Sequence, residues 1–154
     1  MPKFAFSRAL PYEPEQVFDV AADVERYPEF LSGWSAAEIV GREGNIYLTD
    51  QTLVIGPVRQ RFRTRTALMR PDAIDVTAID GPFTDFQLNW SFKPYRTRHC
   101  EVELAGTIDL RARLLRSLFG RVLASGFEDM LAAFEDRVHR IYGQPPPDKF
   151  VGEA

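Results

Sequence analysis

Apolar and polar positions alternate with a period of two in the first ten residues, a pattern that predicts a β-strand over residues 3–10. Pro11 ends this strand, and Glu13-Pro14-Glu15 then places a proline and two acids where a helix N-terminus favours them. The apolar residues that follow recur at helical spacing: Val17, Phe18, Val20, Ala21 and Val24. A second short helix is expected to come next, with Pro28 in its first turn. It should carry Tyr27, Phe30 and Leu31.

From residue 34 to residue 108 the pattern is almost entirely that of strands. The alternation is strictest over residues 86–92, where Phe86, Leu88, Trp90 and Phe92 alternate with polar residues. Turn-forming residues divide the region at four points: Glu43-Gly44-Asn45, Gly56-Pro57, Pro71-Asp72 and Gly81-Pro82. Successive strands joined by short turns predict an antiparallel meander of about six strands with one buried face.

A long helix is predicted over residues 110–142, and Gly143 is a natural place for it to end. The proline-rich residues 144–154 are expected to be a flexible tail, so the folded domain should span residues 1–143. The predicted fold class is therefore α+β: a curved antiparallel sheet wrapped around one long C-terminal helix, which covers its apolar face.

The first half of this helix carries two apolar rows instead of one. Leu110, Leu114, Leu118 and Val122 form one row, and Leu115, Phe119 and Leu123 form the other. One explanation is that the helix begins near Leu114 and that Leu110 belongs to the preceding strand. Another is a kink at Gly126. A third is that one row faces a ligand opening or a membrane surface, because arginines are interspersed among these apolar residues.

Composition and charge narrow the class of protein. The chain has 154 residues, of which 45% are hydrophobic, including 12 phenylalanines, and its net charge is −3. These values favour a globular domain and disfavour DNA as a partner. Cys100 is the single cysteine, which excludes an internal disulfide. Without a recognisable signal or long apolar span, the expected location is the cytoplasm.

Arginine occurs at every second residue of one predicted strand, at Arg59, Arg61, Arg63 and Arg65. These guanidinium groups should share one face, where acids such as Asp75 or Glu103 on neighbouring strands balance them, or where they bind a headgroup or RNA phosphate. The opposite face, with Gln60, Phe62 and Thr64, should point inward. Buried polar groups need partners, and a ligand with a polar head would supply them.

The residues for familiar catalytic chemistry are missing from the sequence pattern. The two histidines, His99 and His139, are far apart and lack ligand-like neighbours, so no metal site is expected. Cys100 follows His99 directly and should face the other side of the same strand, which disfavours a Cys-His nucleophile. No phosphate-binding glycine loop or nucleophile elbow is present. We therefore expect a binding protein without catalytic residues.

Three segments resemble one known family. Residues 23–31, Asp-Val-Glu-Arg-Tyr-Pro-Glu-Phe-Leu, together with Tyr12, Val17 and Phe18, look like the opening of coenzyme Q-binding START-like proteins, which are grouped with polyketide cyclases and dehydrases. Residues 80–83, followed by Leu88, Trp90, Phe92 and Pro94, resemble the second signature of that family. Met130, Ala133-Phe134-Glu135 and Arg137 match its terminal helix. The family usually has a proline after Phe-Leu, where this chain has Ser32.

The resemblance implies a helix-grip fold with an apolar cavity and ubiquinone or a similar polyprenyl lipid as a non-covalently bound ligand. The implied role is a lipid chaperone for quinone biosynthesis and respiratory electron transport. Residues expected to contact the ligand are Phe30, Leu31, Gln60, Phe62, Thr64, Phe83, Phe86, Leu88, Trp90, Leu118, Val122 and Met130. Arg111, Arg113 and Arg116 are expected to contact the inner face of the membrane.

Two other functions stay open. One branch of the same family consists of toxins that bind the large ribosomal subunit and inhibit translation, and the arginine strand favours that function while the net charge disfavours it. A cyclase or dehydrase is the second alternative, and it needs an acid-base pair inside the cavity, for which the sequence offers no convincing candidate.

Overall fold

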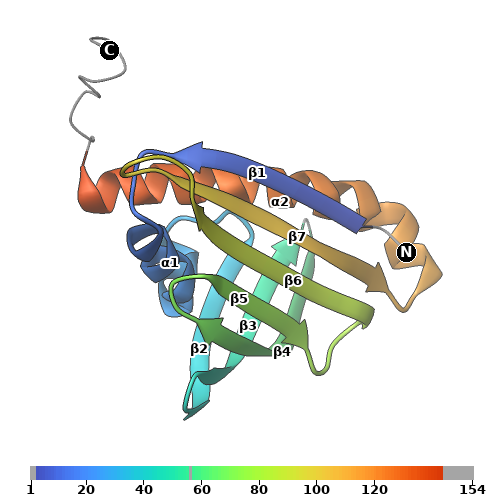
Figure 1. The fold of residues 1–154 in the computed structure, drawn as a ribbon. Coiled ribbons are helices and arrows are strands. Elements are labelled where there is room, and N and C mark those ends of the chain that lie inside the picture. The colour runs from blue at the N-terminus through green and yellow to red at the C-terminus, as the bar shows by residue number, and fades with distance from the viewer. Residues whose placement is uncertain (1–2, 56, 144–154) are drawn as a thin grey trace.

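A computed structural model describes residues 3–55 and 57–143, with only the backbone described at Ile55, at residues 114–125 and at Phe127. One seven-stranded antiparallel sheet is crossed by a long helix, and a shorter helix and a 3-10 helix lie at one end (Figure 1). In chain order the elements are β1 (Lys3–Leu10), α1 (Pro14–Ala22), the 3-10 helix η1 (Val24–Glu29), β2 (Trp34–Glu43), β3 (Ile46–Ile55), β4 (Val58–Met69), β5 (Ala73–Ala78), β6 (Phe83–Pro94), β7 (Cys100–Leu110) and α2 (Arg113–Tyr142).

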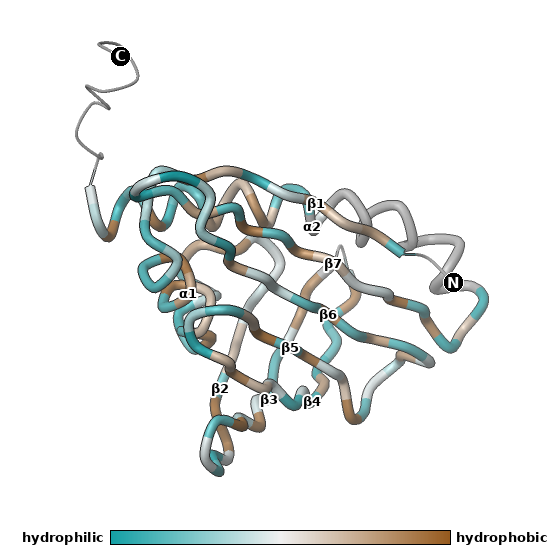
Figure 2. The backbone as a smooth tube through the Cα atoms, in the orientation of Figure 1, coloured by the Kyte–Doolittle hydropathy of each residue, from teal (hydrophilic) through white to brown (hydrophobic). Residues whose placement is uncertain are grey.

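The sheet has the strand order β1-β7-β6-β5-β4-β3-β2, so every strand from β2 to β7 pairs with its neighbour in sequence. Only β1 departs from this meander, because it returns to pair with β7 along its whole length. Hydrophobic and hydrophilic residues alternate along the central strands (Figure 2). This alternation places one apolar face under the helices, and it confirms the predicted α+β class and the curved antiparallel sheet.

Helix α1 begins as predicted. Glu13 is its N-cap, and the side chain of Gln16 accepts a hydrogen bond from the Glu13 backbone nitrogen at 2.9 Å, while Pro14 occupies the first turn. The second short helix differs from its prediction. It is a 3-10 helix that ends at Glu29, so Pro28 lies near its end, and Phe30 and Leu31 follow it. Because proline lacks a donor, it is tolerated in a short turn whose hydrogen bonds are few.

Helix α2 begins at Arg113 instead of residue 110. Leu110 is the last residue of β7 and is buried, so the first apolar row proposed for the helix loses its first member. The late start was one of the explanations for the two rows. The backbone of α2 is helical from Arg113 through Gly126 to Tyr142, and Gly143 follows it as predicted.

The second half of α2 packs on the sheet through its buried apolar residues. Leu131, Phe134 and Val138 are each 2% exposed or less, and they join the core formed by α1, β6 and β7. Two side-chain bonds fix the end of the helix. The Tyr12 hydroxyl donates to the carbonyl of Gly143 at 2.7 Å and lies 2.5 Å from Nδ1 of His139.

The turns predicted at residues 43–45, 71–72 and 81–82 are confirmed, whereas the turn at residues 95–99 between β6 and β7 was not predicted. The turn at Gly56 and the tail at residues 144–154 lie outside the described residues. One glycine inside a strand is required by close approach. A β-carbon added to Gly106 on β7 would lie 2.1 Å from the carbonyl oxygen of Gln87 on β6. A strand residue other than glycine cannot be accommodated there without displacing the neighbouring backbone.

Candidate ligand-binding site

Three phenylalanines gather on the helix-covered face of β4 and β6. The ring centroids of Phe62 and Phe83 are 5.1 Å apart, those of Phe62 and Phe86 are 5.4 Å apart, and those of Phe83 and Phe86 are 4.8 Å apart. We refer to these three residues as the Phe62 cluster. Gly81 brings the β5–β6 turn onto it, because its φ of +104° suits glycine and an added β-carbon would lie 2.8 Å from Cβ of Phe62. The turn therefore limits the space above this cluster.

A second aromatic group surrounds Phe134 of α2. Its ring centroid lies 4.8 Å from that of Trp90, 5.1 Å from that of Phe30 and 5.3 Å from that of Tyr27. We refer to these four residues as the Phe134 cluster. All these contacts are edge-to-face, the arrangement that aromatic quadrupoles favour. The cluster holds the 3-10 helix, the sheet and α2 together at one end of the covered face.

Arg137 packs against one member of the Phe134 cluster. Its guanidinium carbon lies 5.0 Å from the ring centroid of Phe30, and its Nη2 donates to Glu29 at 2.8 Å. This hydrogen bond from Arg137 lowers the pKa of the Glu29 carboxyl below its ordinary value, although partial burial opposes the shift. The partly exposed Phe30 is therefore held between α2 and the end of η1.

Between these clusters, β3 and β4 present polar side chains to the covered face. The indole nitrogen of Trp34 donates to Oε1 of Gln51 at 2.7 Å, and Nε2 of Gln51 donates to the hydroxyl of Thr64 at 2.9 Å. The Thr64 hydroxyl in turn donates to the backbone carbonyl of Thr49 at 3.4 Å. Thr49 and Thr64 are opposite each other in the strand pair and are fully buried, and Gln51 is 6% exposed. The covered face thus contains a hydrogen-bonded polar strip among aromatic side chains.

The sequence pattern placed Thr64 on the inner face but did not identify Gln51 or Thr49. Both lie at alternate positions of β3, and only the observed register, in which Gln51 is opposite Phe62, assigns them to that face. Too few apolar residues flank this part of β3 for alternation alone to show which face of the sheet its side chains occupy. The sequence did contain one signal. Thr49, Gln51 and Leu53 occupy every second position of the strand, so the two polar side chains share a face with the apolar Leu53.

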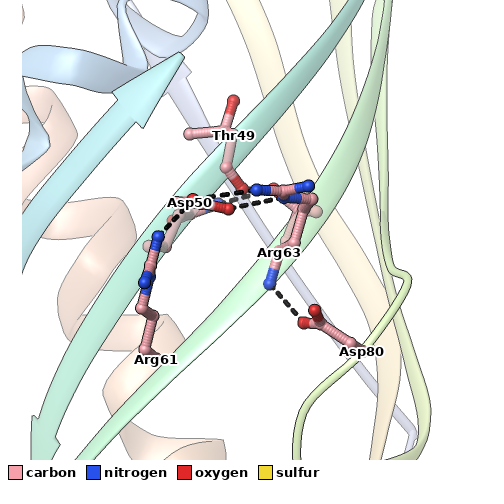
Figure 3. A network of polar contacts seen from close by, with 7 residues as sticks. Thr49, Asp50, Arg61, Arg63 and Asp80 are labelled. Carbon is pink, nitrogen blue, oxygen red and sulfur yellow. Dashed lines mark hydrogen bonds and ion pairs between the residues drawn. The ribbon is translucent and has the colours of Figure 1, made fainter. Parts of the chain in front are cut away.

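The arginines of β4 lie on the other face of the sheet, as predicted. Asp50 accepts hydrogen bonds from Arg61 at 2.5 Å and from Arg63 at 2.6 and 3.1 Å (Figure 3). The Asp50 side chain is 10% exposed, and its bond from Arg63 holds the pKa of its carboxyl at about 2, below the ordinary value of 3.8. The backbone nitrogen of Arg63 also donates to Asp80 at 2.6 Å.

The prediction that acids balance the arginines is therefore confirmed for two of them, but the acid was misidentified. Asp75 accepts a hydrogen bond from the amide of Asn89 at 2.7 Å, and Glu103 is exposed on β7. The adjacent strand β3 supplies Asp50 instead. Arg59 and Arg65 are exposed, and no ion pair involves either of them within the described residues.

The remaining residues predicted to contact a ligand are distributed unevenly. Leu31, Leu88 and Met130 are buried in the core. Gln60 is partly exposed, and its amide donates to the neighbouring carbonyl of Arg61 at 2.8 Å. The side chains of Leu118 and Val122 lie outside the described residues.

The three arginines predicted to contact a membrane lie where β7 gives way to α2. Arg111 and Arg113 are exposed, while the Arg116 side chain is outside the described residues. Arg111 also connects this junction to the β5–β6 turn, since its backbone nitrogen donates to Pro82 at 2.7 Å and its Nη2 donates to the Phe83 carbonyl at 3.2 Å. The junction therefore borders the Phe62 cluster.

The described residues show little of the chemistry of a metal site or a membrane span. They contain no group of three or more His, Cys, Asp or Glu side chains arranged to hold a metal ion. Among the described residues, no helix is both long enough and apolar enough to cross a membrane. Burial raises the pKa of the Cys100 thiol to about 11, which keeps this side chain protonated and a poor nucleophile at neutral pH.

A family described as "Polyketide cyclase / dehydrase and lipid transport" matches residues 10–135. The match covers α1, the whole meander from β2 to β7 and most of α2. The chain belongs to this family. The polyketide cyclase and lipid transport fold accounts for the sheet, the crossing helix and the covered face between them, and it agrees with the START-like family that the sequence resembles.

Proteins similar in sequence to this chain carry different names. "Ribosome association toxin RatA" of Pseudomonas aeruginosa is 32% identical over 137 residues, which cover 89% of this chain and 95% of the relative. "Coenzyme Q-binding protein COQ10 homolog B, mitochondrial" of Xenopus laevis is 21% identical over 146 residues, which cover 92% of this chain and 60% of the relative.

One solved structure shares this fold at low sequence identity. The Zhui aromatase/cyclase from a Streptomyces species superposes with a TM-score of 0.82, over 90% of this chain and 94% of that chain, at 14% identity. At this identity the likeness concerns the fold alone.

Proposed function

We propose that this protein binds a polyprenyl quinone such as ubiquinone, or a closely similar uncharged lipid, between the covered face of the sheet and α2. The role that follows is a lipid chaperone serving quinone biosynthesis and respiratory electron transport, without a catalytic step of its own. The observation that carries the proposal is the Phe62 cluster, which places three large apolar rings on the face that the helix covers.

Affinity for such a ligand would come mainly from apolar area. Removing apolar surface from water is worth about 25 cal/mol per Å², so a polyprenyl tail enclosed by phenylalanine rings gains several kcal/mol without any specific polar contact. The family description includes lipid transport, and the Xenopus relative is named for coenzyme Q binding, and both support this choice of ligand.

A binding experiment with decylubiquinone tests the proposal. Trp90 belongs to the Phe134 cluster and Trp34 contacts Tyr27 of the same cluster, so quinone binding on this face should quench tryptophan fluorescence. Phe83→Ala removes a ring from the Phe62 cluster at a partly exposed position and should weaken binding about 10-fold, the equivalent of about 1.4 kcal/mol. Ile79→Ala is the matched control, because Ile79 is 53% exposed before the same turn and should leave binding unchanged. Absence of saturable binding to the unmodified protein would refute the proposal.

A second candidate function is association with the ribosome. The specific observation that favours it is the Pseudomonas relative, which has nearly the same length and is named as a ribosome association toxin. On this chain the exposed Arg59 and Arg65 of β4 would be the phosphate contacts, because neither has an acidic partner within the described residues.

Co-sedimentation with ribosomes at increasing salt separates the two functions. If the outer arginines bind RNA, Arg59→Glu with Arg65→Glu should abolish co-sedimentation and leave quinone binding unchanged. Arg140→Glu is the matched charge reversal, since Arg140 is exposed at the far end of α2 and pairs only with Asp136 within the described residues. Equal co-sedimentation of all variants would exclude the β4 surface.

A further inference from the structure

The polar strip on the covered face contains a hydroxyl that the fold does not use. Thr49 is 0% exposed, and its Oγ1 has no hydrogen-bond partner in the described part of the chain. A buried hydroxyl without a partner destabilises the folded state, whereas an alkyl group of the same shape would not. Figure 3 shows this side chain pointing away from Asp50 and the two arginines, toward the opposite face.

The neighbours of Thr49 fix which hydrogens are available. Trp34 can only donate, so Oε1 of Gln51 is the atom that accepts its bond and Nε2 faces Thr64. An amide nitrogen carries two hydrogens, and the bond to Thr64 uses one of them. The Thr64 hydroxyl uses its own hydrogen to donate a hydrogen bond to the backbone carbonyl of Thr49. The strip therefore offers donors, namely the Thr49 hydroxyl and the second amide hydrogen of Gln51.

The strip is also uncharged. The polar residues buried in the described part of the chain are Thr49, Asp50, Gln51, Thr64 and Thr66, and Asp50 is the charged one. Asp50 lies on the outer face, where Arg61 and Arg63 bind it. A carboxylate or phosphate placed against the strip would thus be buried without a described counter-charge, at a high cost in free energy.

We propose that Thr49 and Gln51 form the headgroup site of this protein and donate hydrogen bonds to a carbonyl oxygen of an uncharged ligand. The inference rests on the proposed function and narrows it: the ligand is a neutral carbonyl compound with an apolar tail, and fatty-acid anions and phospholipids are excluded. Because the Thr49 oxygen is enclosed in the unliganded chain, side chains above it must move when the ligand binds.

Thr49→Val tests this site, since valine keeps the shape of threonine and removes the hydroxyl. The probes are decylubiquinone, dodecylbenzene as an apolar molecule without carbonyl groups, and laurate as an anion. The variant should bind decylubiquinone about 3- to 10-fold more weakly, as expected for one hydrogen bond, and dodecylbenzene as tightly as the unmodified protein does. Thr49→Ser keeps the hydroxyl and should restore most of the quinone affinity.

A folding control accompanies the binding measurements. Because the Thr49 hydroxyl has no partner in the unliganded chain, Thr49→Val should melt at the same temperature as the unmodified protein or higher, so weaker binding would not reflect misfolding.

The outcomes distinguish the headgroup site from the proposed function. If the unmodified protein binds neither decylubiquinone nor dodecylbenzene, the proposed function fails and this inference fails with it. If it binds both, and Thr49→Val binds decylubiquinone with unchanged affinity, the headgroup site is wrong while the lipid-binding function stands. Laurate binding at pH 8 as tight as quinone binding would overturn the argument from charge.

Discussion

Asp50 of β3 lies directly opposite Arg63 of β4, and its two carboxylate oxygens accept two hydrogen bonds from that guanidinium group. Bidentate pairs of this kind are among the stronger polar interactions in proteins. The pair fastens β3 to β4 on the outer face, directly behind the strip formed by Thr49, Gln51 and Thr64. The pair therefore helps to maintain the register between β3 and β4, and this register aligns the residues of the candidate site.

We expect Asp50→Asn to reduce the free energy of unfolding at pH 7 by about 1–2 kcal/mol, because the charge-assisted bonds to Arg61 and Arg63 weaken while both arginines stay partly in water. The pKa of Asp50 is lowered to about 2 in the folded chain, so its contribution is complete above its ordinary pKa of 3.8 and is lost as the pH falls toward 2.

Urea unfolding between pH 7 and pH 2 checks this prediction. The unmodified protein should lose stability more steeply below pH 4 than Asp50→Asn does. Asp136→Asn is the control, because Asp136 pairs with Arg140 in an exposed i,i+4 pair of α2 and should change stability by less than about 0.5 kcal/mol. Parallel pH curves for the unmodified protein and Asp50→Asn would show that the pair does not govern acid sensitivity.

Gly106→Ala should destabilise the fold by about 3 kcal/mol or more, because the new β-carbon would lie 2.1 Å from the carbonyl oxygen of Gln87 and neither backbone can yield easily. Thermal melting measures the effect. Gly126→Ala is the matched substitution. Nothing lies within 4 Å of its added β-carbon, and alanine is the better helix former, so stability should rise by about 0.5–1 kcal/mol. Similar melting temperatures for the two variants would contradict this account.

Much of the fold was predictable because local patterns and global packing agree. The residues around Glu13 and Pro14 mark the start of α1, and the strict alternation from Phe86 to Phe92 marks a strand with one buried face. The helical start at Arg113 was harder to predict. Leu110 suits a helix and a strand equally well, and only its pairing with Phe83 assigns it to β7.

The candidate site was predictable in part. Phe62, Phe83, Phe86 and Trp90 were named from the sequence as ligand contacts. Phe86 and Trp90 alternate in phase along β6, whereas Phe83 is out of phase with them and reaches the cluster beyond a register shift between Phe83 and Asp85. Thr49 and Gln51 were missed because a polar residue does not by itself indicate that it lies on the buried face of a strand. Their place on the covered face depends on how β3 aligns with β4, a long-range pairing that no local pattern specifies.

The end of α2 should depend on the hydroxyl of Tyr12. This group donates to the Gly143 carbonyl, one of the carbonyls that a helix end leaves without an internal partner, and it also contacts His139. Tyr12→Phe should therefore lower the free energy of unfolding by about 1 kcal/mol. Hydrogen exchange should accelerate at the last turn of α2 and not at β6. Uniform acceleration throughout the chain would contradict a local role.

Phe134 should be the most sensitive single position of the aromatic groups. It is 2% exposed, and its ring contacts Tyr27 of η1, Phe30 just after η1 and Trp90 of β6. Phe134→Ala leaves a cavity that these rings cannot fill together, and the cost should be about 3–5 kcal/mol.

Ile141, on the same helix, is the control for this substitution. It is 51% exposed, and Ile141→Ala should cost less than about 1 kcal/mol by urea unfolding. If decylubiquinone binds between the sheet and α2, saturating quinone should raise the melting temperature of both variants, because a ligand that binds only the folded chain stabilises it by mass action. A Phe134→Ala variant as stable as Ile141→Ala would mean that the end of the sheet is held by α1 instead of by α2.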